Sequence, residues 1–385
     1  MSDPIRHLYV HVPFCGRRCS YCDFSIAVRK EVPATEFSTS VIGELKRRSD
    51  RGQLANLETV YFGGGTPSKL GGAGVAGLLA GLRAAGVVFG EGAGTPAFGV
   101  GSIAGSGTEV TIEVNPEDLT QEAAEAWLAA GVNRLSLGVQ SFSPEALTWM
   151  HRTHSAGQAH EAVRVARAAG FSNLSIDLIY AVPSRVHRSW DDDLTAAIEL
   201  NPEHLSVYGL TIEPRTPLGK WTARGAELPQ TDDRAADEFL EGHERLTSAG
   251  FEHYEVSSYA KPGRRSRHNS AYWRRVPYLG LGPSAHSYDG QSRRWNIAAL
   301  AAWEQAVAAG VDPVAGTEQL TAEQNAAEEL YLALRADTGA RLSGADLVAA
   351  RSWVAAGWAT EESGLVRLRA EGWLRLDALV GALSR

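Results

Sequence analysis

The chain alternates short apolar runs with longer segments in which apolar residues recur every three or four positions. The short runs are rich in β-branched and aromatic residues and are largely apolar, which is typical of parallel strands buried on both faces. Six of these runs are expected to form strands, at residues 7–12, 59–62, 110–114, 134–137, 174–179 and 204–210.

The longer segments between these runs have the periodicity of amphipathic helices. Some begin at a recognisable start signal, since Ser143 precedes Pro144, and Thr120 and Thr231 are similar N-caps. Strands that alternate with helices predict βαβ units around a parallel sheet. The expected helices cover residues 35–48, 74–85, 122–130, 144–151, 157–169, 190–200 and 232–249.

Six βα units predict an α/β fold whose core, residues 1–250, is a partial (β/α)6 TIM-like barrel. An open doubly wound sheet is the alternative. Residues 251–298 are rich in arginine and aromatic side chains and are expected to hold few regular elements. Residues 299–385 are expected to form a smaller helical, winged-helix-like C-terminal domain with a short hairpin. The glycine-dense residues 86–107 are expected to be a surface insertion, and no function is assigned to them.

Composition narrows the class of protein. A formal net charge of −8 argues against a protein held to nucleic acid by phosphate contacts. No apolar signal core precedes the first expected strand, and the longest apolar stretch, residues 71–82, is too short and glycine-rich to span a bilayer. The 3 cysteines are odd in number and clustered, which predicts a metal or redox role in a reducing compartment. We therefore expect a cytoplasmic protein.

The cysteines have the spacing C-x3-C-x2-C, at Cys15, Cys19 and Cys22, directly after the first expected strand. Three thiolates can hold three corners of a cubane iron–sulfur cluster and leave one iron open to a small molecule. The two arginines between the first two cysteines place positive charge beside the thiols, which favours thiolates. The alternative is a structural zinc site made of the three cysteines and His11.

Polar residues and glycines gather where the expected strands end. Gly63–Gly65 let a ligand approach the backbone closely, and their N–H groups can meet a carboxylate; a simple tight turn is the alternative. Glu113 and Asp177 are carboxylates in otherwise apolar strands and need polar partners, either a ligand or structural ion pairs. Because ligand-binding loops of barrel-like folds follow the C-terminal ends of strands, these residues are expected to share one site with the cysteines.

The cysteine segment resembles the signature of the radical SAM superfamily. The resemblance implies a [4Fe–4S] cluster whose open iron binds S-adenosylmethionine and cleaves it to a 5′-deoxyadenosyl radical. From about residue 8 to residue 288, the chain is similar to the branch that contains oxygen-independent coproporphyrinogen III oxidases and HemW-type haem chaperones. That similarity implies S-adenosylmethionine contacts from Tyr9, Gly64, Gly65, Thr66, Glu113, Gln140, Arg152 and Asp177.

Two departures from the oxidase pattern favour a chaperone. The oxidase motif continues to a fourth cysteine, but Phe24 stands at that position, and the long segment expected before the oxidase's first strand is missing. Residues 268–273 match the HNxxYW motif of the haem chaperones, which implies a haem contact from His268. The alternative for His268 is a histidine packed and hydrogen-bonded in the protein interior.

The chaperone interpretation predicts haem as cargo and a haem-accepting protein as partner, with a membrane-associated acceptor among the candidates. It predicts no nucleic-acid partner, and it leaves peripheral membrane contact and a homodimer open. Residues 261–294 hold eight Lys or Arg side chains against one acidic residue. Such a block is usually a solvated face, but here it predicts an anion-binding face beside the cluster mouth, for tetrapyrrole carboxylates or an acidic membrane surface.

Overall fold

The computed structural model describes residues 4–48, 54–90 and 107–383, and six parallel strands form the centre of its main sheet. The strands are hydrogen-bonded to one another in chain order. They are β1 (Ile5–Val12), β4 (Leu54–Gly64), β5 (Glu109–Val114), β6 (Arg134–Gln140), β7 (Leu174–Tyr180) and β8 (His204–Gly209). All six expected strands are therefore present, whereas most of the expected insertion lies outside the described residues.

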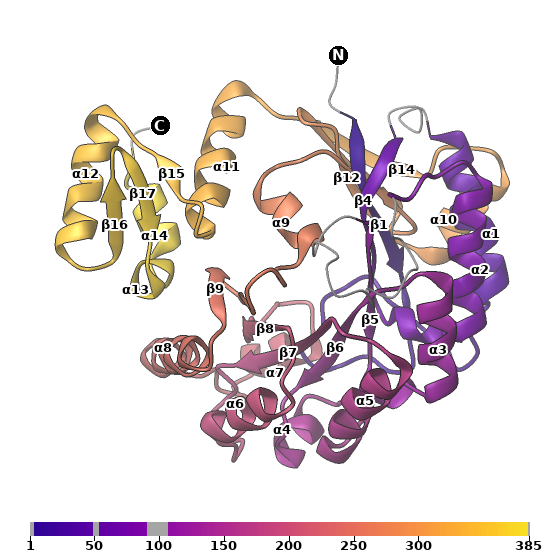
Figure 1. The fold of residues 1–385 in the computed structure, drawn as a ribbon, viewed down its shortest axis with the longest axis horizontal. Coiled ribbons are helices and arrows are strands. Elements are labelled where there is room, and N and C mark those ends of the chain that lie inside the picture. Colours follow the sequence, from indigo (N-terminus) through magenta and orange to yellow (C-terminus); the bar gives the residue numbers. More distant parts are fainter. Residues whose placement is uncertain (1–3, 49–53, 91–106, 384–385) are drawn as a thin grey trace.

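Helices cover the outer side of these strands (Figure 1). Neighbouring helices pack side by side in chain order, and the strand order never reverses as it would at the switch point of a doubly wound sheet. The partial barrel is thus confirmed, and the doubly wound alternative is wrong. The helices are α1 (Ala34–Arg47), α2 (Gly71–Ala84), α3 (Gln121–Ala130), α4 (Pro144–Trp149), α5 (Ala156–Ala169), α6 (Trp190–Glu199) and α8 (Asp232–Ser248).

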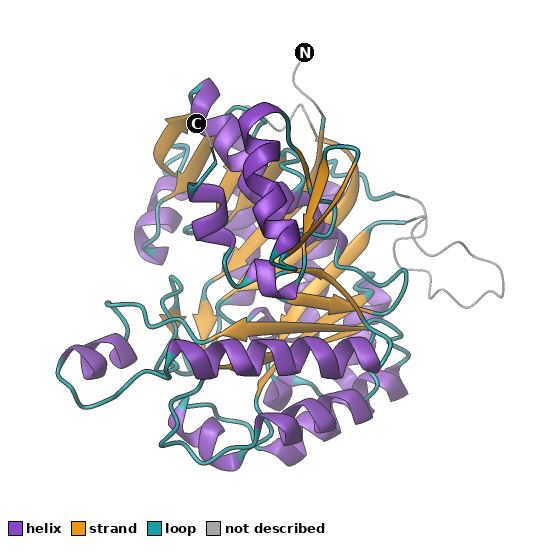
Figure 2. Cartoon of the chain, turned by 90° about the vertical axis from the view of Figure 1, so that its left-hand side faces the viewer, coloured by secondary structure: helices purple, strands orange, loops and turns teal. Residues whose placement is uncertain are grey.

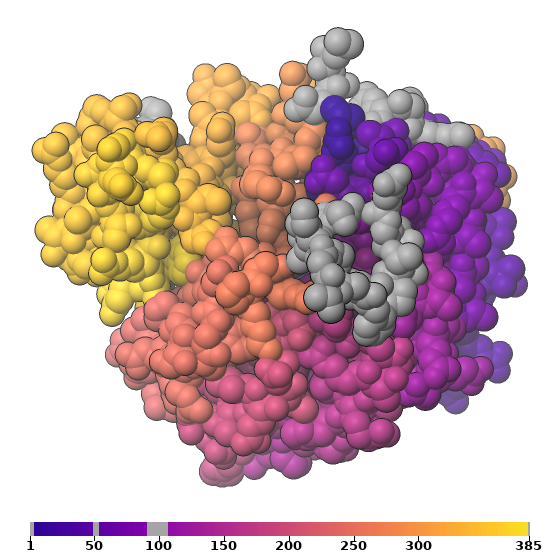
Figure 3. Space-filling view, viewed as in Figure 1, coloured from indigo at the N-terminus to yellow at the C-terminus, as the bar shows by residue number. Residues whose placement is uncertain are grey.

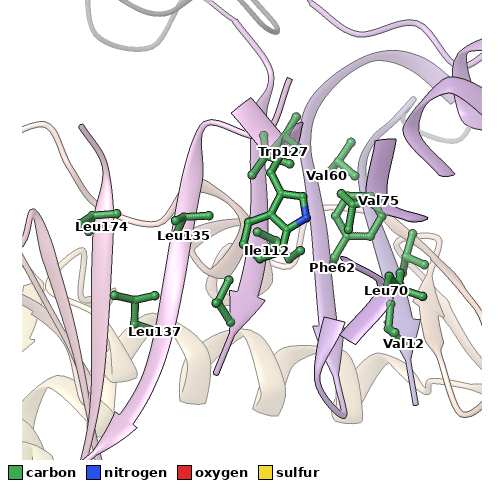
Figure 4. Close-up of a cluster of buried hydrophobic side chains, with 14 of the residues drawn as sticks. Val12, Val60, Phe62, Leu70, Val75, Ile112, Trp127, Leu135, Leu137 and Leu174 are labelled. Carbon is green, nitrogen blue, oxygen red and sulfur yellow. The ribbon is translucent and has the colours of Figure 1, made fainter. Parts of the chain in front are cut away.

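The strands largely alternate between apolar and polar side chains. In β1, Leu8 and Val10 are buried in the layer under the helices, whereas His7 and Tyr9 face the barrel interior beside other polar rings. Figure 4 shows part of the apolar layer, where Trp127 of α3 lies against strand residues. The expectation of strands apolar on both faces is therefore wrong, because the interior of this barrel is lined by polar groups.

Residues 251–298 extend the sheet at both edges, so the expectation of few regular elements there is wrong. At one edge, β10 (Ser258–Ala260) and β9 (Glu252–Glu255) pair antiparallel after β8. At the other edge, β11 (Tyr278–Leu281) pairs parallel with β1. Three antiparallel strands then follow: β12 (His286–Tyr288), β13 (Ser292–Asn296) and β14 (Val314–Gln319).

A second unit at the C-terminus has its own hydrophobic cluster, which includes Trp353 and Trp373. It appears as a separate lobe in Figure 3, and the chain ends in it at the upper side of the view in Figure 2. Its resemblance to a winged helix remains a prediction. It contains α11 (Ala322–Arg335), α12 (Gly344–Ala355), α13 (Ala370–Trp373), α14 (Leu376–Gly381) and a three-stranded antiparallel sheet of β15 (Ala340–Arg341), β17 (Leu365–Leu368) and β16 (Ala359–Glu362).

The proposed division of the chain at residue 299 is also still a prediction, and side-chain packing favours a later boundary. Trp303 and Val307 of α10 (Leu300–Ala308) belong to the first core, because α10 packs on α1. No described helix is long and apolar enough to cross a membrane.

A candidate functional site at the carboxyl ends of the strands

A cavity of about 620 Å³ opens at the carboxyl ends of the six parallel strands. Its volume falls within the roughly 300–1,000 Å³ typical of small-molecule sites. Loops that are far apart in the sequence line it, as expected for the ligand end of a barrel. Ten of the twelve residues implicated by sequence lie on its wall: Cys15, Cys19, Cys22, Gly64, Gly65, Thr66, Glu113, Gln140, Arg152 and Asp177.

The cysteine loop is anchored against two neighbouring segments. Cys15 ends the short strand β2 (Phe14–Cys15), which pairs with β3 (Ala27–Val28) and so folds the loop back on itself. The Cys15 thiol lies 3.3 Å from the Thr66 hydroxyl, and Arg152 Nη1 lies 3.7 Å from Cys19 Sγ. Three thiols from one anchored loop therefore face the same cavity.

Burial controls the protonation of the thiols more strongly than the nearby arginines do. Burial raises the pKa of Cys15 and raises that of Cys22 to about 11, and the charge of Arg18 opposes this only weakly. The expectation that the flanking arginines favour thiolates is therefore wrong for these two thiols. A bound metal centre has to displace their protons, as thiolate-ligated metals do.

The donor set fits a cluster better than a single metal ion. Both ring nitrogens of His11 are engaged, because Nε2 lies 2.9 Å from the Ser25 carbonyl oxygen and Nδ1 lies 3.2 Å from the Tyr9 hydroxyl. Within residues 4–48, 54–90 and 107–383, no three His, Cys, Asp or Glu side chains come together as ligands of one ion. A cubane binds each thiolate through a different iron, so it does not need that convergence. The zinc alternative with His11 is thus not supported.

The glycines after β4 permit a close approach between this turn and β1. Gly64 has φ +113°, and a Cβ there would lie 2.6 Å from the His11 ring; a Cβ on Gly65 would lie 2.7 Å from the Pro13 carbonyl. Their N–H groups are already used, because Gly64 donates to Glu113 Oε2 at 3.1 Å and Gly65 donates to the Val12 carbonyl at 2.8 Å. The carboxylate that meets Gly64 therefore belongs to the chain itself.

Two carboxyl groups face the cavity from adjacent parts of the sheet. Glu113 accepts a hydrogen bond from the Tyr61 hydroxyl at 2.8 Å, and the Ser136 hydroxyl lies 3.2 Å from Asp177 Oδ1. Burial raises the pKa of Glu113 to about 7 and also raises the pKa of Asp177. Paired carboxyls that retain acceptor capacity suit hydroxyl groups of a ligand such as ribose.

The raised pKa of Glu113 predicts a pH-dependent stability. Its ordinary value is 4.5, so between about pH 4.5 and 7 this carboxyl binds more protons in the folded ligand-free protein than in the unfolded chain. The contribution of Glu113 to stability should therefore fall as pH rises through this window, by up to about 3 kcal/mol. The difference in unfolding free energy between wild type and Glu113→Gln, measured by urea unfolding across this range, isolates this contribution, and wild type should lose stability relative to the variant as pH rises. Coinciding profiles would contradict it.

Arg152 lies on the cavity wall and is not a surface charge at the end of a helix. Its Nη2 donates to Asn115 Oδ1 at 2.8 Å and to the Gly138 carbonyl at 2.6 Å. In the part of the chain that the structure describes, its buried Nε has no hydrogen-bond partner and remains available to a ligand. Gln140 follows a register shift in β6 and adopts φ +69°, a conformation that is uncommon for a side-chain-bearing residue.

Two residues implicated by sequence lie away from the cavity wall. Tyr9 stacks on Tyr61 inside the barrel. His268, in α9 (Arg267–Trp273), is 1% exposed, with Nδ1 2.6 Å from the Thr59 hydroxyl and Nε2 2.9 Å from the Tyr272 hydroxyl. These contacts favour a packed interior histidine over a haem ligand.

The arginine-rich block is largely neutralised by acidic residues from other segments. Arg265 pairs with Glu252 and Asp337, and Arg294 pairs with Asp312. Arg267, Arg275 and Arg293 also pair with acidic side chains, and none of the eight basic residues lines the cavity. The expectation of an anion-binding face beside the cluster mouth is therefore wrong. A count of charges along the sequence could not show that acidic residues from other segments lie against these arginines.

The sequence interpretation left several wall residues out of the site. Tyr61 and Ser136 both line the cavity. They are polar members of the alternating strands β4 and β6. The alternation of apolar and polar positions was the signal that could have identified them.

Comparison with known proteins agrees with this geometry. Residues 9–196 match the model of the radical SAM superfamily. The heme chaperone HemW of Mycobacterium tuberculosis (strain CDC 1551 / Oshkosh) is 35% identical over 98% of this chain and 94% of its own length. The heme chaperone HemW of Escherichia coli K12 is 39% identical over 74% of this chain and 70% of its own.

A solved structure supports the fold. The coproporphyrinogen III oxidase HemN of Escherichia coli, described as a radical SAM enzyme, superimposes with a TM-score of 0.78. The match covers 99% of this chain and 90% of that one at 22% identity, so it bears on the fold alone. Radical SAM membership implies a [4Fe–4S] cluster and S-adenosylmethionine. With its cysteine loop, its cavity and a similarity to these chaperones that covers 74% to 98% of its length, the chain belongs to the HemW family of the radical SAM superfamily.

Proposed function

We propose that the chain is a haem chaperone that binds a [4Fe–4S] cluster, S-adenosylmethionine and haem, and delivers the haem to an acceptor protein. The observation that carries the proposal is the anchored three-thiol loop on a ligand-sized cavity, in a chain similar to HemW chaperones over almost its whole length. Phe24, 59% exposed, stands on this loop where the oxidase motif has its fourth cysteine.

Different residues on the cavity wall would bind the cluster and the different parts of S-adenosylmethionine. The thiolates of Cys15, Cys19 and Cys22 would hold the cluster, and the free Nε of Arg152 suits the methionyl carboxylate. Glu113 and Asp177 suit the ribose hydroxyls. The other proposed contacts are Gly64, Gly65, Thr66 and Gln140, together with Tyr9 from behind the wall. When bound, the cluster and S-adenosylmethionine would supply one-electron cleavage of the sulfonium.

The acceptor would be a haem protein, with a membrane-associated one among the candidates. A cytoplasmic location is part of the proposal, because three free thiols suit a reducing compartment. The proposal leaves peripheral membrane contact and a homodimer open.

An anaerobic haem titration tests the proposal. Protein carrying its cluster should give a saturable Soret band with ferric haem and should form no protoporphyrinogen IX from coproporphyrinogen III with S-adenosylmethionine and a reductant. The absence of a Soret band would overturn the chaperone interpretation. Turnover of coproporphyrinogen would instead support the second candidate, the oxygen-independent oxidase, which the fold match alone keeps in view.

A further inference from the structure

His151 is the only one of the 11 histidines that lines the cavity, and all of them lie within the described residues. It sits between α4 and α5 in a left-handed conformation with φ +61°. Neither ring nitrogen makes a hydrogen bond to any described residue. Its ring instead packs edge-on against the indole of Trp221, with centroids 5.6 Å apart and planes at 71°. An imidazole held by ring packing, with both nitrogens free, can ligate a metal.

Backbone hydrogen bonds tie His151 and Trp221 to the cysteine loop. The N–H of Ser20, between two of the cysteines, donates to the Met150 carbonyl at 3.2 Å. The Ser20 carbonyl accepts from the N–H of Leu218 at 2.9 Å, in the helix that carries Trp221, α7 (Pro217–Ala223). Three segments distant in sequence therefore form one rim beside the thiols.

Three basic residues flank Trp221 along the sequence. Arg215, Lys220 and Arg224 are exposed, and their side chains make no ion pair or hydrogen bond with any residue of the described ranges. They differ in this respect from Arg265 and Arg294 of the arginine-rich block, whose charges are paired. Free cations that flank an aromatic residue in the sequence suit a flat apolar ligand that carries carboxylates.

We propose that haem binds at this rim, with the imidazole of His151 as axial ligand of the iron. The inference rests on the proposed haem-carrying function and names the residue that would ligate the haem iron. An axial imidazole stands upright on the porphyrin plane, so an indole inclined at 71° to it can lie along the porphyrin face. The propionates then meet Arg215, Lys220 and Arg224. The iron forms one bond to an imidazole nitrogen and releases a water ligand, with no change of oxidation state.

The test is haem titration of His151→Gly in cluster-loaded, anaerobic protein, with the spectrum of the cluster subtracted. Glycine suits φ +61°, so the variant should fold at least as well as wild type. The histidine-ligated Soret and low-spin electron paramagnetic resonance signals should disappear. Affinity should fall at least roughly tenfold, since losing even a supporting partner of a ligand costs about 10- to 100-fold. Free imidazole should restore the spectrum.

His286→Ala is a matched control, because His286 is exposed, stacks on Trp295 and lies outside the cavity. It should bind haem as wild type does. A variant with Arg215, Lys220 and Arg224 all changed to Gln should keep the spectrum of wild type and bind more weakly, with less dependence on salt. Unchanged affinity in this variant would overturn the propionate contacts.

The outcomes separate this inference from the proposed function. Haem binding by wild type with an unchanged spectrum in His151→Gly would overturn the ligand assignment alone. Loss of the spectrum in His268→Ala but not in His151→Gly would do the same and return the ligand to the HNxxYW motif. Failure of wild type to bind haem would overturn both the ligand and the proposed function.

Discussion

Replacing Cys15, Cys19 and Cys22 together by alanine is expected to abolish iron and sulfide incorporation and, with it, S-adenosylmethionine binding. The chain has 3 cysteines, so no other thiol can take their place. The thiols line one cavity with Arg152 and Glu113, and a cluster held there would supply the open iron for the ligand's amino and carboxylate groups. Iron and sulfide content after anaerobic reconstitution, and equilibrium dialysis with S-adenosylmethionine, measure the two losses.

Phe24→Ala is the control for this experiment. Phe24 is exposed on the same loop and contributes no thiol, so its variant should incorporate iron and sulfide as wild type does. Equal iron and sulfide content in wild type and the triple variant would contradict the assignment. Zinc in place of iron in the reconstituted wild type would contradict it as well.

Glu44→Ala is expected to destabilise the fold by about 3–5 kcal/mol. Glu44 of α1 is 0% exposed and accepts hydrogen bonds from Gly282 N at 2.9 Å, Asn296 Nδ2 at 2.7 Å and Trp303 Nε1 at 2.9 Å. It also lies 3.8 Å from the buried guanidinium of Arg48. Alanine would leave three donors and a buried positive charge without this carboxylate. Urea unfolding gives the free energy directly.

Glu36→Ala on the same helix serves as its control. Glu36 is exposed in the first turn of α1 and pairs with no residue in the part of the chain that the structure describes. Its charge favours the helix dipole, so its loss should cost about 1 kcal/mol or less. An effect of Glu44→Ala as small as that of Glu36→Ala would show that the carboxylate does not hold the late strands on α1.

Sequence reasoning predicted the barrel because its signals are local. Each strand of β1 to β8 is an apolar-rich run, and caps such as Thr120 and Ser143 accept hydrogen bonds from their helices as expected. The cysteine motif and the residues that end strands were found for the same reason. Parallel pairing then brought ten of them to one cavity without further information.

The features that sequence reasoning missed depend on contacts across long separations. Strands β11 to β13 have three to five residues, and their own pattern is weak. β11 pairs with β1, β12 with β11 and β13 with β12, so each depends on a neighbour that the local sequence does not show. The packing of α9 in the barrel likewise decides whether His268 faces solvent or Thr59. The acids that neutralise Arg265 and Arg294 come from other segments, which a count within residues 261–294 could not include.

The placement of β1 has a consequence for the order of folding during synthesis. Leu8 pairs with Val60 on one side and with Leu279 on the other. At a translation rate of about 5–20 residues per second, the second partner leaves the ribosome roughly tens of seconds after the first. Until then the N-terminal strand presents an unpaired edge, which is the kind of surface that recruits foreign strands. A nascent chain that stalls before β11 would therefore be prone to aggregation unless a folding factor shields that edge.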